Sequence, residues 1–93
     1  MNYVDLVLLK EDEANIYMAP KFSMLKPDDH VVVVTGTGME NILTVKDVMS
    51  VSVESDEYRF ILELAGQKRP LKITKAVHFN AYDYGDGDAD EKE

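Results

Sequence analysis

Short apolar runs alternate with charged or glycine-containing turns along most of the chain. Residues 3–9 form the first run and residues 15–19 the second, with the charged residues 10–13 between them. Both runs are rich in residues that favour strands. Pro20 stops the second run, because proline is tolerated only at the end or the edge of a strand. The two runs are therefore predicted to form a hairpin.

Four consecutive valines, residues 31–34, mark the clearest strand in the chain, because branched side chains fit the pleated conformation. The run contains no polar residue, so both faces of the strand are expected to be covered and its position is expected to be central. Gly36-Thr37-Gly38 predicts a hairpin turn into the next strand, since glycine adopts the positive φ that such turns need.

Two interpretations are open for residues 40–54: two strands, or one long strand bent by a bulge at Lys46-Asp47, and the bent strand is preferred. Residues 57–64 alternate between apolar and charged side chains, which predicts a half-exposed strand. In that strand Phe60 and Leu62 are expected to face the core and Glu63 the solvent. Ile61 is an apolar misfit on the outer face.

The last predicted strand has four apolar side chains on one face: Leu71, Ile73, Val77 and Phe79. Lys75 falls on the same face, so a bulge or an early exit to the edge of the sheet is expected there. From residue 83 onward, glycine and acidic residues leave nothing to bury. Residues 83–93 are therefore expected to form a disordered acidic tail behind a folded domain of residues 1–82.

Six or seven short strands without a convincing helix indicate an all-β domain, and a small, partly open barrel of the SH3-like kind is preferred. A closed sheet without edges would also solve the aggregation problem that so many valines would otherwise create. An OB-like barrel and a small sandwich are the alternatives. The OB fold usually carries a helix between its middle strands, and none is predicted here.

Residues 20–29 are predicted to form a long loop, because the segment is bracketed by prolines and too short for a stable helix. It contains three apolar residues: Phe22, Met24 and Leu25. Phe22 and Leu25 are expected to turn under the body, and Phe22 or Met24 to be partly exposed in the monomer. All three are candidate binding residues, because so short a chain has a thin core that a protein partner or a second copy would complete.

The chain has 93 residues, one domain at most, and no cysteine, which excludes disulfides and thiolate metal sites. No apolar run is long enough to span a bilayer and the first residues do not resemble a signal peptide, so a cytoplasmic location is expected. The net charge is −8, but residues 83–93 hold six acids and one base, which leaves −3 for residues 1–82. This distribution weakens the hypothesis of an acidic body that mimics DNA.

The sequence contains no recognisable catalytic or metal-binding pattern. His30 and His78 lie 48 residues apart without ligand spacing, and the serines are in no nucleophile motif. Residues 86–90 resemble half of a calcium loop, but the acid at its twelfth position and the flanking helices are lacking. The sequence therefore predicts no enzyme, no cofactor and no metal site.

One basic cluster occurs, formed by Lys68, Arg69, Lys72 and Lys75. With Tyr58, Phe79 or Tyr82 nearby it could bind single-stranded nucleic acid, where cations hold phosphates and rings stack on bases. The acidic tail would compete for the same cations, so nucleic-acid binding is the alternative. The preferred function is a non-enzymatic binding or accessory module that acts through protein contacts.

Residues 3–10, 19–23 and 25–34 together resemble small uncharacterised proteins carried by prophages and mobile elements of Firmicutes, and the acidic end is similar in style. This resemblance implies a phage or mobile-element origin and no particular activity. Residues 25–31 are also similar to the Leu-Lys-x-Gly-Asp-x-Val segment that opens a strand in small β-barrels of many functions. Asp28 takes the place of the glycine in that segment.

Overall fold

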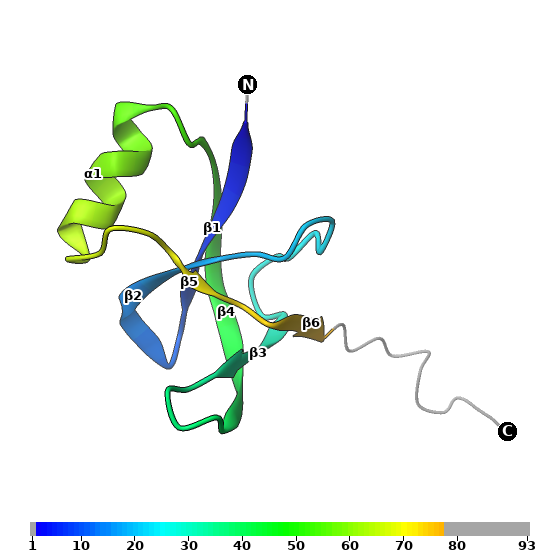
Figure 1. Cartoon of the computed structure of the whole chain (residues 1–93). Coiled ribbons are helices and arrows are strands. Elements are labelled where there is room, and N and C mark those ends of the chain that lie inside the picture. Colours follow the sequence, from blue (N-terminus) through cyan, green and yellow to red (C-terminus); the bar gives the residue numbers. More distant parts are fainter. Residues whose placement is uncertain (1, 78–93) are drawn as a thin grey trace, which may run out of the picture.

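One curled sheet of six strands and one helix make up residues 2–77, the part of the chain that this computed structural model describes (Figure 1). The elements are β1 (Tyr3–Leu9), β2 (Asp12–Met18), β3 (His30–Val34), β4 (Glu40–Ser52), α1 (Asp56–Leu64), β5 (Leu71–Lys72) and β6 (Lys75–Val77). Their order across the sheet is β5-β2-β1-β4-β3-β6. The predicted all-β, partly open barrel is confirmed.

Both hairpins predicted from the apolar runs are present. β1 pairs antiparallel with β2, and β3 pairs antiparallel with β4 through a turn in which Gly38 has a φ of +85°. Residues 31–33 of the valine run are buried, whereas Val34 is exposed. β3 lies between β4 and β6, next to the edge of the sheet rather than at its centre.

β4 is one strand with a bulge, as preferred from the sequence. Leu8 of β1 lies opposite Asp47 and Leu9 opposite Val45, so Lys46 is the extra residue. The half of β4 before the bulge pairs with β3 and the half after it pairs with β1. A bulge bends a strand and increases its twist. The bend therefore lets one strand belong to both halves of the curled sheet.

The segment containing β5 and β6 crosses from one edge of the sheet to the other, because β5 pairs with β2 and β6 pairs with β3. Between the two strands, the Ile73 amide donates to the Met18 carbonyl (3.4 Å) and the Thr74 amide to the Val32 carbonyl (2.8 Å). This crossing brings the two edges of the sheet together and completes the half-barrel.

The crossing also interrupts the predicted last strand. Ile73 is buried and Lys75 is exposed, because the break between β5 and β6 changes which side chains face inward. The misfit of Lys75 in the sequence pattern is thereby explained. Phe79, the boundary predicted at residue 82 and the tail predicted at residues 83–93 lie outside the described residues.

The strand predicted at residues 57–64 is wrong, because this segment forms α1. Four side chains at helical spacing pack against the sheet: Tyr58, Ile61, Leu62 and Ala65. Leu62 is buried as predicted, but Phe60 is 58% exposed and does not belong to the core. Ile61, the misfit of the strand pattern, fits the helical pattern.

The end of α1 also protects an edge of the sheet. Gly66 has a φ of +70°, its amide donates to the Glu63 carbonyl (3.0 Å), and the Gln67 amide donates to the Leu62 carbonyl (2.9 Å), which is a common glycine-terminated helix end. The Gln67 side chain then accepts a hydrogen bond from the Ile16 amide (2.7 Å) and donates to the Ile16 carbonyl (3.1 Å). Its amide group thus takes the place of a neighbouring strand at the edge of β2.

The apolar core has two parts on opposite faces of the sheet. Successive residues of a strand point to opposite faces, so Leu6 faces α1 while Val7 faces the inside of the curl. The part under α1 consists of Leu6, Ile16, Val51 and Leu62. The part inside the curl consists of Val7, Leu9, Tyr17, Leu25, Val31, Val33, Val45 and Ile73.

Candidate binding groove at the 20–25 loop

The loop that follows β2 turns its apolar side chains in opposite directions. Leu25 is buried in the core, whereas Phe22 is 96% exposed and Met24 is 82% exposed. These are the two most exposed large hydrophobic side chains in the described part of the chain. The expectation that Phe22 turns under the body is therefore wrong. The expectation that Phe22 or Met24 is exposed is confirmed.

The backbone conformation of the loop produces this arrangement. Phe22 (φ 63°) and Met24 (φ 51°) adopt the left-handed region, which costs a residue other than glycine about 1–3 kcal/mol. The Ser23 amide donates to the Pro20 carbonyl (3.2 Å), and Leu25 anchors the loop in the core. The loop is thus held in a strained shape that leaves both exposed side chains in solvent.

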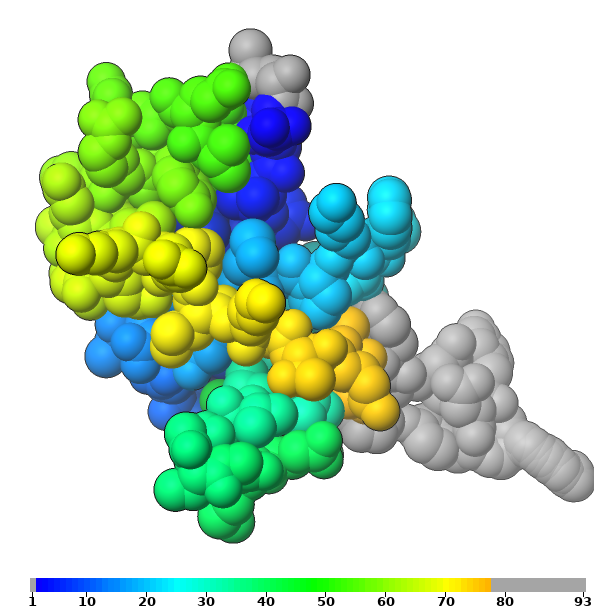
Figure 2. Space-filling view, in the orientation of Figure 1, coloured from blue at the N-terminus to red at the C-terminus, as the bar shows by residue number. Residues whose placement is uncertain are grey.

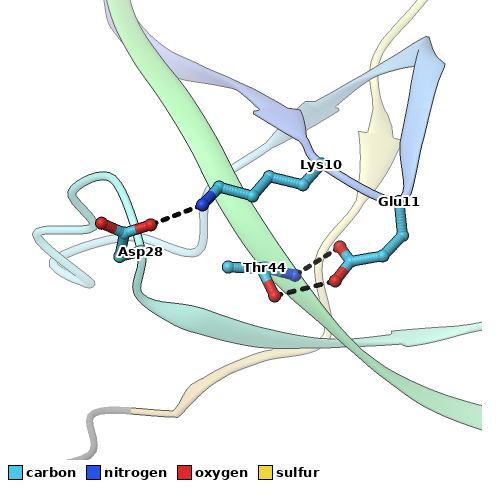
Figure 3. Close-up of polar contacts among 4 residues, drawn as sticks. All are labelled: Lys10, Glu11, Asp28 and Thr44. Carbon is cyan, nitrogen blue, oxygen red and sulfur yellow. Dashed lines mark hydrogen bonds and ion pairs between the residues drawn. The ribbon is translucent and has the colours of Figure 1, made fainter.

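The far end of the loop is tied to the rest of the sheet through Asp28 (Figure 3). Its carboxylate lies 2.6 Å from Nζ of Lys10, and its amide donates to the Val45 carbonyl (2.8 Å). The hydrogen bond between the two side chains lowers the pKa of Asp28 and raises the pKa of Lys10, because it stabilises both charged forms. Asp28 has a φ of 75°, at the position where the similar β-barrel segment has glycine.

Glu11 makes the second contact in Figure 3, with Thr44 of β4. Its carboxylate accepts hydrogen bonds from the Thr44 amide (2.7 Å) and the Thr44 hydroxyl (2.8 Å). The bond from the amide is the main cause that lowers the pKa of Glu11. A third contact joins Glu13, at the start of β2, to Lys46, at 2.8 Å. The turn between β1 and β2 and the start of β2 therefore brace the bend of β4.

A groove of about 540 Å³ lies where β2 ends and the loop begins. Its apolar lining includes Tyr3 of β1, Met18 of β2, and Pro20 and Phe22 of the loop. We call this hollow the loop groove. Figure 2 shows the loop, in light blue, projecting from the surface next to the crossing segment, in yellow and orange. The loop groove is thus an open, mainly apolar surface with Phe22 on its wall.

The lining of the loop groove contains more cations than acids. Lys21 and Lys72 line the groove, together with one acid, Asp5. Four cations elsewhere are ion-paired with acids: Lys10, Lys26, Lys46 and Arg59. Five others make no ion pair within residues 2–77: Lys21, Lys68, Arg69, Lys72 and Lys75. The cations that make no ion pair within residues 2–77 therefore lie on the loop and on residues 68–75.

The basic cluster predicted from the sequence is spread over the turn after α1 and over β5 and β6: Lys68, Arg69, Lys72 and Lys75. Of these four residues, Lys72 lines the loop groove. Tyr58, one of the three rings that the nucleic-acid alternative offered, packs against the core from α1. Phe79 and Tyr82 lie outside the described residues.

Sequence reasoning missed part of this site. Lys21, Tyr3 and Met18 were not predicted as binding residues, although Lys21 is next to Phe22 in the loop that had been singled out. Lys21 could have been predicted, because a cation next to an aromatic residue in a loop is visible in the sequence. Tyr3 and Met18 could not have been predicted, because their place in the groove depends on how β1 and β2 lie relative to each other.

Within residues 2–77, no three His, Asp or Glu side chains come together as a metal site would require. His30 begins β3, whereas His78 and residues 86–90 lie outside the described part.

No family model, curated protein or solved structure matches this chain. The resemblance to prophage and mobile-element proteins, like the expected cytoplasmic location, therefore stays a prediction. The helix that the structure describes in residues 2–77 spans nine residues and is too short to cross a membrane.

Proposed function

We propose that this chain is a non-enzymatic binding module that holds an acidic and apolar segment of a protein in the loop groove. The observation that carries the proposal is the exposure, on strained backbone, of Phe22, which lines the groove, and of Met24, which belongs to the same loop but not to the groove lining. Residues other than glycine persist in the left-handed region only where the surrounding structure enforces it, and such positions gather at binding sites. Exposed aromatic and methionine side chains are also those that protein interfaces favour.

The charge around the groove supports an acidic occupant. Lys21 and Lys72 outnumber Asp5 in the lining, and neither lysine makes an ion pair within residues 2–77. Opposite charges at the rim of an interface favour the matching partner and speed its association. A segment with both acids and an apolar anchor fits this surface better than a purely apolar one.

A nucleic acid would meet the same cations, which makes it the alternative occupant. Base stacking needs aromatic rings free to receive the bases. Tyr58 packs against the core from α1, and this removes one of the rings that the alternative relied on. Phe22 and Tyr3 line the groove and would stack on bases as well as on protein side chains, so the preference for a protein occupant rests on the mainly apolar lining of the groove.

Fluorescence anisotropy with labelled probes tests the proposal. The probes are a peptide of alternating aspartate and phenylalanine, an all-aspartate peptide of the same length, and a thymidine oligonucleotide of the same charge. Phe22→Ser/Met24→Ser is expected to weaken binding of the first peptide by about thirtyfold or more, because each of the two side chains is expected to contribute more than about 1 kcal/mol. Phe60→Ser/Met39→Ser is the matched control, since it removes an exposed Phe and an exposed Met elsewhere.

Four other results would contradict or change the proposal. Equal losses in the two double variants would contradict binding at the loop groove. Tighter binding of the oligonucleotide than of either peptide would favour the nucleic-acid alternative. Light scattering at high concentration shows whether a second copy is the partner, because the same double variant should then reduce self-association. A small molecule that co-purifies in the groove would contradict the proposal.

A further inference from the structure

The sequence of this chain contains a segment with the properties that the loop groove favours. Residues 78–93 contain three aromatic residues, Phe79, Tyr82 and Tyr84, and six acids, all of them from Asp83 onward. Residues 83–93 carry a net charge of −5, which equals in number the five cations without an ion pair in residues 2–77. The two sets of charges belong to one molecule, so their encounter is intramolecular.

The connection between the two is short. β6 ends at Val77, five residues after Lys72 of the groove. Six extended residues from Val77 to Asp83 span at most about 20 Å, and Lys72 lies at most about 18 Å from Val77. A tether of this length gives an effective concentration in the millimolar range. Even a weak attraction is then sufficient for frequent contact.

We propose that residues 78–93 of the same chain are an occupant of the loop groove, with the acids near Lys21 and Lys72 and an aromatic ring near Phe22. This inference rests on the proposed function, and it means that residues 78–93 regulate the binding of other proteins to the loop groove. The segment competes with any external acidic partner, so an external partner must displace it. The contact requires opposite charges on the segment and the groove and a connection long enough to join them. It does not require a folded segment, because exposed charges attract each other without a fixed geometry.

Paramagnetic relaxation enhancement on the full chain tests the inference. The chain has no cysteine, so Ala89→Cys carries a nitroxide label at one position and keeps every charge. At low salt, the amide signals of Lys21, Phe22 and Lys72 are expected to fall to below about half of their diamagnetic intensity, and about 0.5 M salt should restore them because it screens exposed charges. The amides of Arg59 and Phe60 on α1 serve as a reference face.

A neutral-tail variant provides the matched control. It replaces the six acids of residues 83–93 with amides and keeps the length, the tether and the label. Equal broadening in the charged and the neutral chains would overturn the inference, because tethering alone would then explain the signal. Charge reversal by Lys21→Glu/Lys72→Glu should lower the broadening at Phe22 to the neutral-tail level, and unchanged broadening would contradict the assigned site.

Two further arms separate the possible failures. In a mixture of isotope-labelled chain and spin-labelled chain without isotope, broadening as strong as in the single chain would mean that a second copy supplies the segment, which overturns the intramolecular version. The neutral-tail variant also keeps the proposed function testable by itself. If the neutral-tail variant binds the acidic peptide while the spin label on the charged chain causes no broadening at the groove, the inference fails and the proposed function stands.

Discussion

Tyr17 is a buried residue whose hydroxyl has a charged partner. Its hydroxyl donates to Oδ2 of Asp12 at 2.6 Å, and the Asn15 side chain donates to the same carboxylate at 3.0 and 3.1 Å. Burial, and then the contact with Asp12, raise the pKa of Tyr17 to about 12. The hydrogen bond from Tyr17, followed by that from Asn15, lowers the pKa of Asp12. The pair therefore stabilises the fold while Tyr17 is neutral and Asp12 is ionised.

The sign of the pH dependence follows from these two directions. A raised pKa in the folded state means that the contribution of Tyr17 is complete below its ordinary value near 10 and is lost as the pH rises towards about 12. The lowered pKa of Asp12 means that its contribution is present above its ordinary value near 3.9 and is lost as the pH falls below it.

Tyr17→Phe tests this pair. At neutral pH the variant should be less stable by about 1.5–3 kcal/mol, since it loses a hydrogen bond to a charged group. The difference from the wild type should shrink between about pH 10 and pH 12, because the wild type loses the same contribution there. Urea unfolding at a series of pH values measures both. A difference that stays constant across that range would show that Tyr17 does not titrate as described.

At the scale of elements, α1 shows why a pattern can predict the wrong structure. Residues 58, 60, 62 and 64 are apolar at strand spacing, while residues 58, 61, 62 and 65 are apolar at helical spacing. The helix is favoured by its ends. The Ser55 hydroxyl accepts from the Tyr58 amide (3.1 Å), the acidic residues 56 and 57 complement the helix dipole, and Gly66 ends the helix in the left-handed region. These helix-capping residues are visible in the sequence, but the alternation of apolar residues at every second position favoured a strand.

Other features of the elements differ in how far the sequence could predict them. The bulge at Lys46 and the turn at Gly38 follow from local patterns, and both were predicted. The contact between Gln67 and Ile16 joins residues 51 positions apart. The loop groove likewise requires β1, the 20–25 loop and β5 to meet. A local sequence pattern cannot predict these contacts between distant segments, because they depend on how the whole sheet curls.

Variants of α1 distinguish the helix from the strand first expected. Leu62→Ala should destabilise the fold by about 2–5 kcal/mol, because it removes buried volume. Phe60→Ala should cost less than about 1 kcal/mol, since most of this side chain is in solvent. Glu63→Ala is the exposed control on the same helix. Chemical denaturation gives all three values, and a cost at Phe60 as large as that at Leu62 would contradict the position of the helix.

At the scale of the molecule, the half-barrel is completed by residues that come late in the chain. Ile73 belongs to the core inside the curl, and the Ile73 and Thr74 amides join the two edges of the sheet. We therefore expect folding to depend on Ile73 and Thr74, whereas occupation of the loop groove is proposed to depend on residues 78–93.

Deletion of residues 83–93 tests this separation. It should change the melting temperature by less than about 4 °C, because exposed ion pairs contribute about 0–1 kcal/mol each at most and the net charge falls from −8 to −3, which reduces self-repulsion. Ile73→Ala is the contrasting variant, and its loss of about 2–5 kcal/mol should lower the melting temperature by about 8 °C or more. The same deletion should tighten binding of the acidic peptide by removing its competitor. A fall in melting temperature as large as that of Ile73→Ala would mean that residues 83–93 pack as part of the fold, and their role as a displaceable occupant would be lost.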